Sequence, residues 1–191
     1  MDPQNPPSAP PPAAPPPYAP PGGAGGPFAQ VDPQIRNLAI GLFVLAALVL
    51  IGTFTSSWAT ASERGGDIGA GLTSLEMSGK RGSVSISWGD TPISGDVVFF
   101  GYLALIGGLA SVAGTVAMGV FAITNKPNKI PAKIFNIVLG VTAFAMTSFL
   151  IRLLTAEKLK GLSISYSGII AIGGLIGISV VVKMLTKLKP V

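Results

Sequence analysis

Four long apolar stretches dominate the pattern of hydrophobic and polar positions along the chain. They cover about residues 35–58, 97–124, 134–154 and 167–184. At roughly 1.5 Å per residue, a helix of each length can cross the hydrocarbon core of a bilayer, which is about 30 Å thick. None has the polar face of a helix on the surface of a soluble protein. The pattern predicts a four-transmembrane-helix bundle in one membrane domain, residues 35–186.

Residues 1–34, which precede this domain, hold most of the 17 prolines. Such a segment buries too little apolar surface to fold and favours extended polyproline II. It is interpreted as a disordered cytoplasmic tail or spacer. The alternative is a docking peptide for a proline-binding partner, which the proline triplets at 10–12 and 15–17 would suit. Residues 187–191 form a short basic tail at the other end.

The distribution of lysines between the spans predicts the orientation. Four spans place both termini on one side, together with the short loop that carries Lys126, Lys129 and Lys133. Loops rich in Lys and Arg stay in the cytoplasm. We therefore expect a multi-pass protein of the cell membrane with cytoplasmic termini and with two outer loops, residues 59–96 and 155–166.

The longer outer loop shows the alternation typical of a strand with one buried face. Val84, Ile86 and Trp88 alternate with serines. Residues 72–77 alternate less regularly, and residues 78–82 between the two segments contain the glycines of a turn. The pattern predicts a β-hairpin.

The shorter outer loop repeats this alternation, because Leu162, Ile164 and Tyr166 are separated by serines. A hairpin alone is marginally stable in water, and a third strand helps considerably. We expect one small extracytoplasmic antiparallel β-sheet, with two strands from the first loop and one from the second. Its apolar face would rest on the helix ends and its serine face would meet solvent or a partner. The alternative is an unstructured serine-rich loop.

The composition restricts the chemistry. The chain has no cysteine and no histidine, so disulfides, thiolate catalysis and the commonest general base and metal ligand are excluded. The eight acidic residues show no metal-loop spacing. Basic residues lie beside the spans and form no stripe interleaved with aromatics, which argues against nucleic-acid binding. We expect no catalytic site, no cofactor and no metal, and hence a protein that is not an enzyme.

Arg152 stands near the outer end of the third span. A charge at this depth can extend to the membrane interface, which is the simpler interpretation. The alternative is an ion pair with Asp96, at the outer end of the second span, or with Glu157. Such a pair would hold the loop sheet on the helices.

Small residues recur in the second and fourth spans at a spacing of four. Gly107, Gly114, Gly173 and Gly177 each belong to such a pair. Small residues let helices approach closely in lipid. They are interpreted as packing inside the bundle, and the alternative is a face for self-association or for a partner's helix.

This arrangement resembles the claudin-like tetraspan superfamily in topology over residues 35–186. Trp58 follows the first span, where these proteins often have a tryptophan, and Gly71 and Leu72 match the start of their Gly-Leu-Trp triplet. Thr73 stands in the third position, and the family's paired loop cysteines have no counterpart. The resemblance implies lateral assembly, adhesion, ion selection between cells or regulation of a partner channel.

We therefore expect a membrane protein that acts by interaction or assembly through its outer sheet, in the bilayer, with itself or with other membrane proteins. The candidate interaction residues are Trp58, Leu72, Val84, Ile86, Trp88, Ile164 and Tyr166. The alternatives are an accessory or regulatory subunit of a larger membrane complex and a small channel or transporter.

Overall fold

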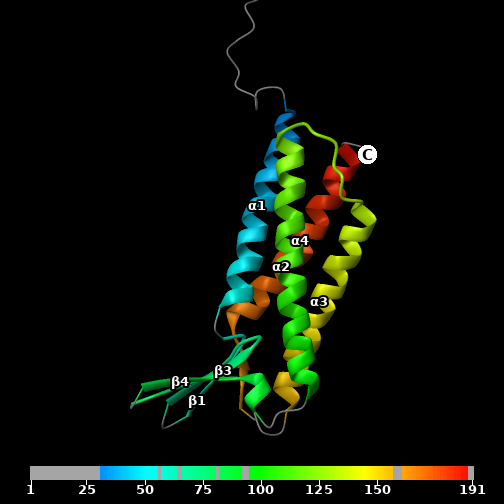
Figure 1. Ribbon diagram of the computed structural model, residues 1–191. Coiled ribbons are helices and arrows are strands. Elements are labelled where there is room, and N and C mark those ends of the chain that lie inside the picture. Colours follow the sequence, from blue (N-terminus) through cyan, green and yellow to red (C-terminus); the bar gives the residue numbers. More distant parts are fainter. Residues whose placement is uncertain are drawn as a thin grey trace, which may run out of the picture. The chain divides into compact units, whose positions relative to one another are not determined.

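The computed structural model describes residues 31–55, 57–63, 66–80, 82–91, 95–156 and 161–188 (Figure 1). In chain order the elements are α1 (Pro33–Phe54), β1 (Ala59–Glu63), β2 (Gly66–Ala70), β3 (Ser74–Gly79), β4 (Gly82–Ser87), the 3-10 helix η1 (Trp88–Asp90), α2 (Gly95–Ile123), α3 (Ala132–Thr155), β5 (Ser163–Ile164) and α4 (Tyr166–Leu188). The predicted tail, residues 1–34, lies almost entirely outside the described residues.

The four long helices form a bundle whose surface suits a lipid environment. Each is long and apolar enough to cross a membrane. α1 packs mainly against α2 and α4, and α3 packs against the same two helices. Ile40, Ile106, Phe144 and Ile176, one from each helix, are between 52% and 65% exposed. Apolar side chains thus cover the outside of the bundle as well as its centre, and the chain is an integral, multi-pass membrane protein.

The ends of α1 follow from local capping. Asp32 caps the helix by accepting a hydrogen bond from the N–H of Gln34 at 2.7 Å, and Pro33 occupies the first turn, where its missing N–H costs nothing. The helix ends at Phe54, whereas the first apolar stretch of the sequence extends to Trp58. Trp58 leaves the helix because its backbone pairs with the sheet.

Three of the four predicted packing glycines lie between helices. A Cβ on Gly107 would stand 2.5 Å from Thr142 Oγ1, one on Gly114 would stand 2.4 Å from the ring of Phe135, and Gly177 faces a leucine of α1. The fourth, Gly173, has no atom within 4 Å of a Cβ and is exposed. Close approach therefore explains three of these glycines, and Gly173 lies on the outer surface of the bundle.

One end of the bundle, at which α1 ends and α4 begins, carries the sheet, and we call it the sheet end. Gly108 of α2 lies level with Thr53, near the end of α1, because a Cβ on Gly108 would be 3.0 Å from Thr53 Oγ1. The part of α2 that begins at Gly95 therefore extends about 20 Å beyond that level. Figure 1 shows α2 and α3 reaching past the ends of α1 and α4 beside the sheet.

Five strands form one antiparallel sheet in the order β4-β3-β2-β1-β5. Four come from the segment between α1 and α2, and β5, from the segment between α3 and α4, pairs Ile164 with Ala59. The predicted sheet shared by the two loops is confirmed. The predicted number of strands is too small, because β1 and β2 also belong to the sheet.

Two predicted strand residues belong to other elements. Trp88 begins the 3-10 helix η1, and Tyr166 is the first residue of α4. β5 therefore contains only Ser163 and Ile164, with Leu162 outside it. The alternation in each loop continues past the end of its strand, by one residue to Trp88 and by two residues to Tyr166, because the chain turns there to enter the helices.

Candidate functional site

The register of the sheet sorts its side chains onto two faces of opposite character. Side chains alternate along a strand, and residues paired across antiparallel strands share a face. One face, called the apolar face, carries Ala59, Ala61, Ile68, Ala70, Leu75, Met77, Val84, Ile86 and Ile164. The other, called the polar face, carries Thr60, Ser62, Asp67, Gly69, Glu76, Ser78, Ser83, Ser85 and Ser163.

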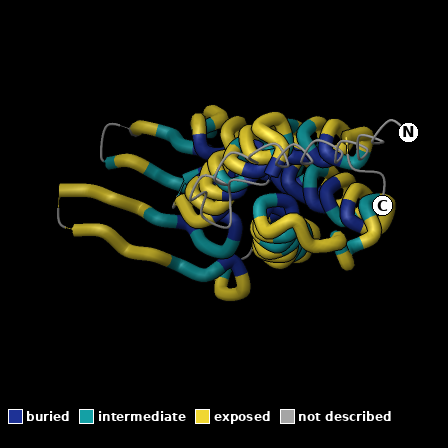
Figure 2. Tube along the Cα trace, turned by 90° about the horizontal axis from the view of Figure 1, so that it is seen from above, coloured by how far each residue is buried: buried dark blue, intermediate teal, exposed yellow. Residues whose placement is uncertain are grey.

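Only the part of the apolar face nearest the helices is buried. Ala70 is fully buried and Leu75 is 7% exposed, whereas Met77 and Val84, further along the same hairpins, are 38% and 59% exposed. Figure 2 shows this gradient along β3 and β4, from dark blue near the helices to yellow at their far ends. The prediction that the apolar face rests on the helix ends is wrong for the outer half, because the hairpins project sideways past the helices.

Trp58 joins the sheet to two helices. Its N–H donates to the carbonyl of Ala70 at 2.6 Å, and its carbonyl accepts from the N–H of Ser165 at 2.9 Å. Its ring meets Phe149 of α3 edge to face at 6.0 Å and lies against Gly168 of α4. The side chain is fully buried. Within the described residues, its indole Nε1 is the only buried side-chain polar atom without a hydrogen-bond partner.

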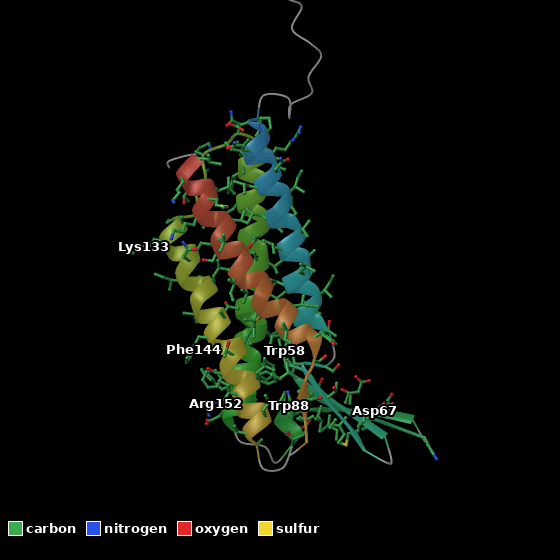
Figure 3. All side chains as sticks on the ribbon, turned by 180° about the vertical axis from the view of Figure 1, so that it is seen from behind. Trp58, Asp67, Trp88, Lys133, Phe144 and Arg152 are labelled. Atoms are coloured by element: carbon green, nitrogen blue, oxygen red, sulfur yellow. The ribbon has the colours of Figure 1, made fainter. Side chains whose placement is uncertain are left out.

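Trp88 fastens the corner between β2 and β3 to the helices. Its indole N–H donates to the carbonyl of Gly71 at 2.9 Å, and its backbone N–H donates to the carbonyl of Thr73 at 3.0 Å. Leu72, between them, is 4% exposed, and its carbonyl would lie 2.1 Å from a Cβ on Gly101 of α2. This corner is therefore held between an indole and a glycine of α2. Figure 3 shows Trp58 and Trp88 at the junction of helices and sheet.

Arg152 connects α3 to α2 at the sheet end. Its guanidinium forms an ion pair with the carboxylate of Asp96 and lies over the ring of Phe100, 4.8 Å from the centroid. The structure thus has one of the two pairs considered from the sequence, and Glu157 lies outside the described residues. The Arg152 and Asp96 side chains are 42% and 64% exposed, so the pair contributes at most about 1 kcal/mol.

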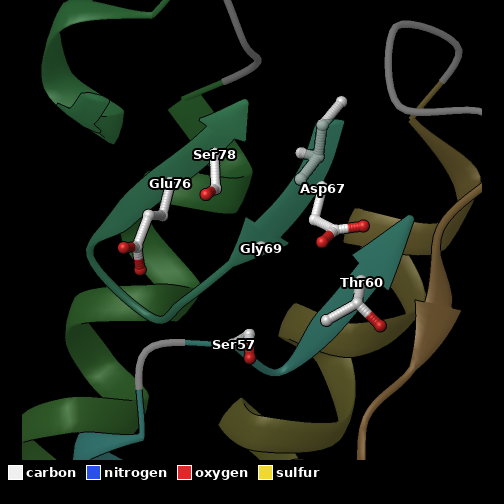
Figure 4. A pocket seen from close by; sticks show the side chains of 7 residues that line it. Ser57, Thr60, Asp67, Gly69, Glu76 and Ser78 are labelled. Carbon is white, nitrogen blue, oxygen red and sulfur yellow. The ribbon is translucent and has the colours of Figure 1, made fainter. Parts of the chain in front are cut away.

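A depression of about 170 Å³ lies on the polar face, against the segment that follows α1 (Figure 4). It is lined by Ser57, Thr60, Asp67, Ile68, Gly69, Glu76 and Ser78. Asp67 accepts a hydrogen bond from the hydroxyl of Ser62 at 2.7 Å. The described residues contain no group of three or more acidic side chains that could hold a metal. The polar face is therefore an acidic, hydroxyl-rich surface of the kind that water solvates well.

The residues predicted for interaction fall into two groups. Trp58, Leu72 and Trp88 are buried at the junction and are inaccessible to a partner. The others lie at the surface: Val84, Ile164 and Tyr166 are 59%, 48% and 83% exposed, and Ile86 is partly buried. The first group holds the sheet in place, and the second is available for contact.

The sequence did not reveal β1 and β2, which lie at the centre of the sheet. Their residues are mostly small, and Ile68 is the only large apolar residue in the two strands. The sequence pattern that could have indicated β2 is the alternation of Asp67 and Ile68 between glycines. This pattern is too short to distinguish a strand from a loop. The acidic character of the polar face was missed because it combines Glu76 of β3 with Asp67 of β2, and β2 was not predicted.

The chain matches no protein-family model, and a search of curated proteins finds no match.

Proposed function

We propose that this membrane protein acts without catalysis, by assembling with other membrane proteins or with copies of itself through its sheet. The observation that carries the proposal is the outer half of the apolar face. Met77 and Val84 are exposed there, although the same face is buried closer to the helices. Exposed apolar surface on a rigid support is typical of protein contact sites.

The support of the sheet favours a display role. Trp58 and Trp88 fix its base through buried rings and four hydrogen bonds, and Leu72 packs against α2 without space for a Cβ on Gly101. A sheet held in this way presents its outer half in a fixed position relative to the bundle. A preformed surface reduces the entropy lost when a partner binds.

A claudin-like role is the specific form of this proposal. It is supported by four membrane-length helices, by the sheet shared between the first and last connecting segments, and by Trp58 directly after α1. In this form, the sheet lies outside the cell membrane and both termini are cytoplasmic. Lys126, Lys129 and Lys133, at the end of the bundle opposite the sheet, support that orientation.

A double substitution tests the proposal. Met77→Ser with Val84→Ser makes the outer apolar face polar, while Ser78→Ala with Ser83→Ala changes the neighbouring residues on the polar face of the same strands. Each protein is purified in mild detergent, its oligomeric mass is measured, and proteins bound in stoichiometric amounts are identified. We expect the first variant alone to lose its assembly.

Unchanged assembly and unchanged bound proteins in the Met77/Val84 variant would contradict the proposal. Wild-type protein that carries a stoichiometric foreign membrane protein, lost in this variant, would identify an accessory subunit that uses the same face. Wild-type protein that binds only its own copies would identify a self-assembling one.

A further inference from the structure

Among the residues that the structure describes, β4 is an open edge of the sheet. It is the terminal strand in the order β4-β3-β2-β1-β5, and its first four residues, Gly82–Ser85, are exposed. Proteins usually protect such an edge with charges, prolines or bulges, because its unpaired backbone groups can bind another strand. Residues 82–87 contain neither a charge nor a proline. The opposite edge, β5, has only two residues and continues into α4.

The backbone groups that β4 leaves free can be identified. The N–H of Trp88 donates to the carbonyl of Thr73, which continues the register of β3 with β4. Residues of an antiparallel strand alternate in the direction of their N–H and C=O groups. Val84 and Ile86 therefore bond to β3, whereas Ser83 and Ser85 direct both backbone groups away from the sheet. Ser87 directs its N–H away, but its carbonyl belongs to η1, which this residue caps.

The free edge is complementary to itself. In an antiparallel pair of two β4 strands centred on Ser85, Ser83 of one copy faces Ser87 of the other and Val84 faces Ile86. Each residue then meets one from the same face of the sheet, so that the apolar face continues from copy to copy. The outward groups of Ser83 and Ser85, with the N–H of Ser87, can form about four backbone hydrogen bonds between the two copies.

Charges at the two ends of β4 favour the same register. Lys80 lies in the turn before β4 and Asp90 in η1 after it, and both are exposed. Pairing centred on Ser85 places the Gly82 end of one β4 next to the Ser87 end of the other. The turn with Lys80 in one copy then lies near η1 with Asp90 in the other, and the twofold symmetry repeats this proximity. A parallel arrangement of the two strands would place like charges together.

The orientation of the sheet allows two copies to meet in one membrane. The strands lie side by side when the bundle is seen from above (Figure 2), and the sheet is much closer to edge-on when the bundle is upright (Figure 1). The twofold axis of the strand pair is perpendicular to the sheet and therefore runs roughly along the bundle. It keeps both bundles upright, one on each side of the shared sheet.

From these observations we infer that the partner of the β4 edge is a second copy of this chain in the same membrane, paired antiparallel about Ser85. The inference rests on the proposed function, since it names a partner for the same sheet. The inference requires backbone hydrogen bonds along the edge of β4. The proposed function requires only contacts through the exposed outer half of the apolar face.

Cysteine cross-linking in native membranes tests the register, because the chain has no cysteine of its own. Residues of a hydrogen-bonded antiparallel pair, as Ser85 would form with its own copy, have Cα atoms about 5.5 Å apart, within disulfide range. We expect Ser85→Cys to form a disulfide-linked dimer on mild oxidation. Ser83→Cys protein should cross-link only when it is co-expressed with Ser87→Cys protein. Ser78→Cys, on the same face but in β3, should remain monomeric.

A charge at the edge tests the energetics. Ser85→Lys places two like charges opposite each other, and we expect the dimer population to fall about tenfold or more. Ser78→Lys is the matched control, because Ser78 faces the acidic polar face of its own copy. Circular dichroism of both variants should match the wild type, since Ser85 is exposed and its backbone groups point away from β3.

The outcomes separate the two proposals. A protein that still assembles, but shows no Ser85→Cys cross-link and no response to Ser85→Lys, overturns the edge pairing and leaves the proposed function standing. If substitution of Met77 and Val84 also leaves assembly unchanged, the proposed function fails as well. A Ser83→Cys cross-link with itself overturns the register about Ser85.

Discussion

At the scale of single residues, the two tryptophans differ in how their polar atoms are used. Both side chains are fully buried at the junction of sheet and helices. The indole N–H of Trp88 satisfies the carbonyl of Gly71, whereas that of Trp58 has no partner among the described residues. The contribution of a buried hydrogen bond to the stability of this protein can therefore be measured separately from the contribution of a buried ring.

Trp88→Phe should destabilise the protein more than Trp58→Phe. Both changes remove a similar volume of buried ring, but only the first leaves a buried carbonyl unpaired, at a cost of about 1–3 kcal/mol. Trp58→Phe serves as the matched control because it removes an N–H that has no acceptor among the described residues. Thermal unfolding in detergent, followed by circular dichroism, measures the difference. Equal loss of stability would contradict the role assigned to the Gly71 carbonyl.

The single arginine of α3 gives a second prediction at this scale. A double-mutant cycle with Arg152→Ala and Asp96→Ala should give a coupling energy of about 0.2–1 kcal/mol, because both side chains are largely exposed. Arg152→Ala alone should cost more than Asp96→Ala, since it also removes the contact with Phe100. Unfolding of the four proteins in detergent gives these values, and an Asp96→Ala effect larger than that of Arg152→Ala would contradict the assignment.

At the scale of elements, helix packing depends on where each glycine faces. Gly173 and Gly174 are neighbours in α4, yet a Cβ on Gly174 would stand 2.6 Å from Val49 of α1 and one on Gly173 would meet nothing within 4 Å. Gly52 of α1 is as restricted, because a Cβ there would stand 2.7 Å from the carbonyl of Ser167. Glycines on both helices thus allow α1 and α4 to approach closely.

Substitution of the two neighbouring glycines should have opposite effects. Gly174→Ala should destabilise the bundle, because the added methyl group overlaps Val49 and forces α1 and α4 apart at a typical cost of about 1–3 kcal/mol. Gly173→Ala should be neutral or slightly stabilising, since alanine favours the helix and has open space. The resistance of each purified variant to thermal unfolding measures this. A loss of stability in Gly173→Ala would place that residue at an interface.

The elements also show what the sequence could predict. The four helices follow from apolar length alone, because a membrane span needs no specific partner to be recognised. β3 and β4 were found through the alternation that ends at Trp88. β1 was missed, since Ala59–Glu63 contains no large apolar residue and its position depends on backbone pairing with β2 and β5. Composition carries no information about such pairing.

Long-range contacts were less accessible. Arg152 had two possible acidic partners, and only the packing of α2 against α3 brings Asp96 to it. The exposure of Met77 and Val84 could not be predicted either, because alternation identifies an apolar face but does not show how far the helices extend beneath it. The sequence predicts that a sheet forms, but it does not predict which part of the sheet is exposed.

At the scale of the whole molecule, the proposed orientation predicts which surfaces a reagent can reach. Ser83→Cys, on the polar face, should react with a membrane-impermeant maleimide added to intact cells. Lys129→Cys, in the α2–α3 connection, should react only after the membrane is permeabilised. If Lys129→Cys reacts in intact cells and Ser83→Cys does not, the orientation is the opposite of the proposed one and the sheet lies in the cytoplasm.

Trp58 and Trp88 are the only tryptophans of the chain, and both are buried where the sheet joins the helices. Intrinsic fluorescence excited at the indole band therefore originates almost entirely from this junction. A red shift of emission would report that the sheet has separated from the bundle even while the helices remain intact. The protein thus carries an optical reporter of its own for the position of the sheet, in detergent, in vesicles or with a bound partner, and no label is needed to read it.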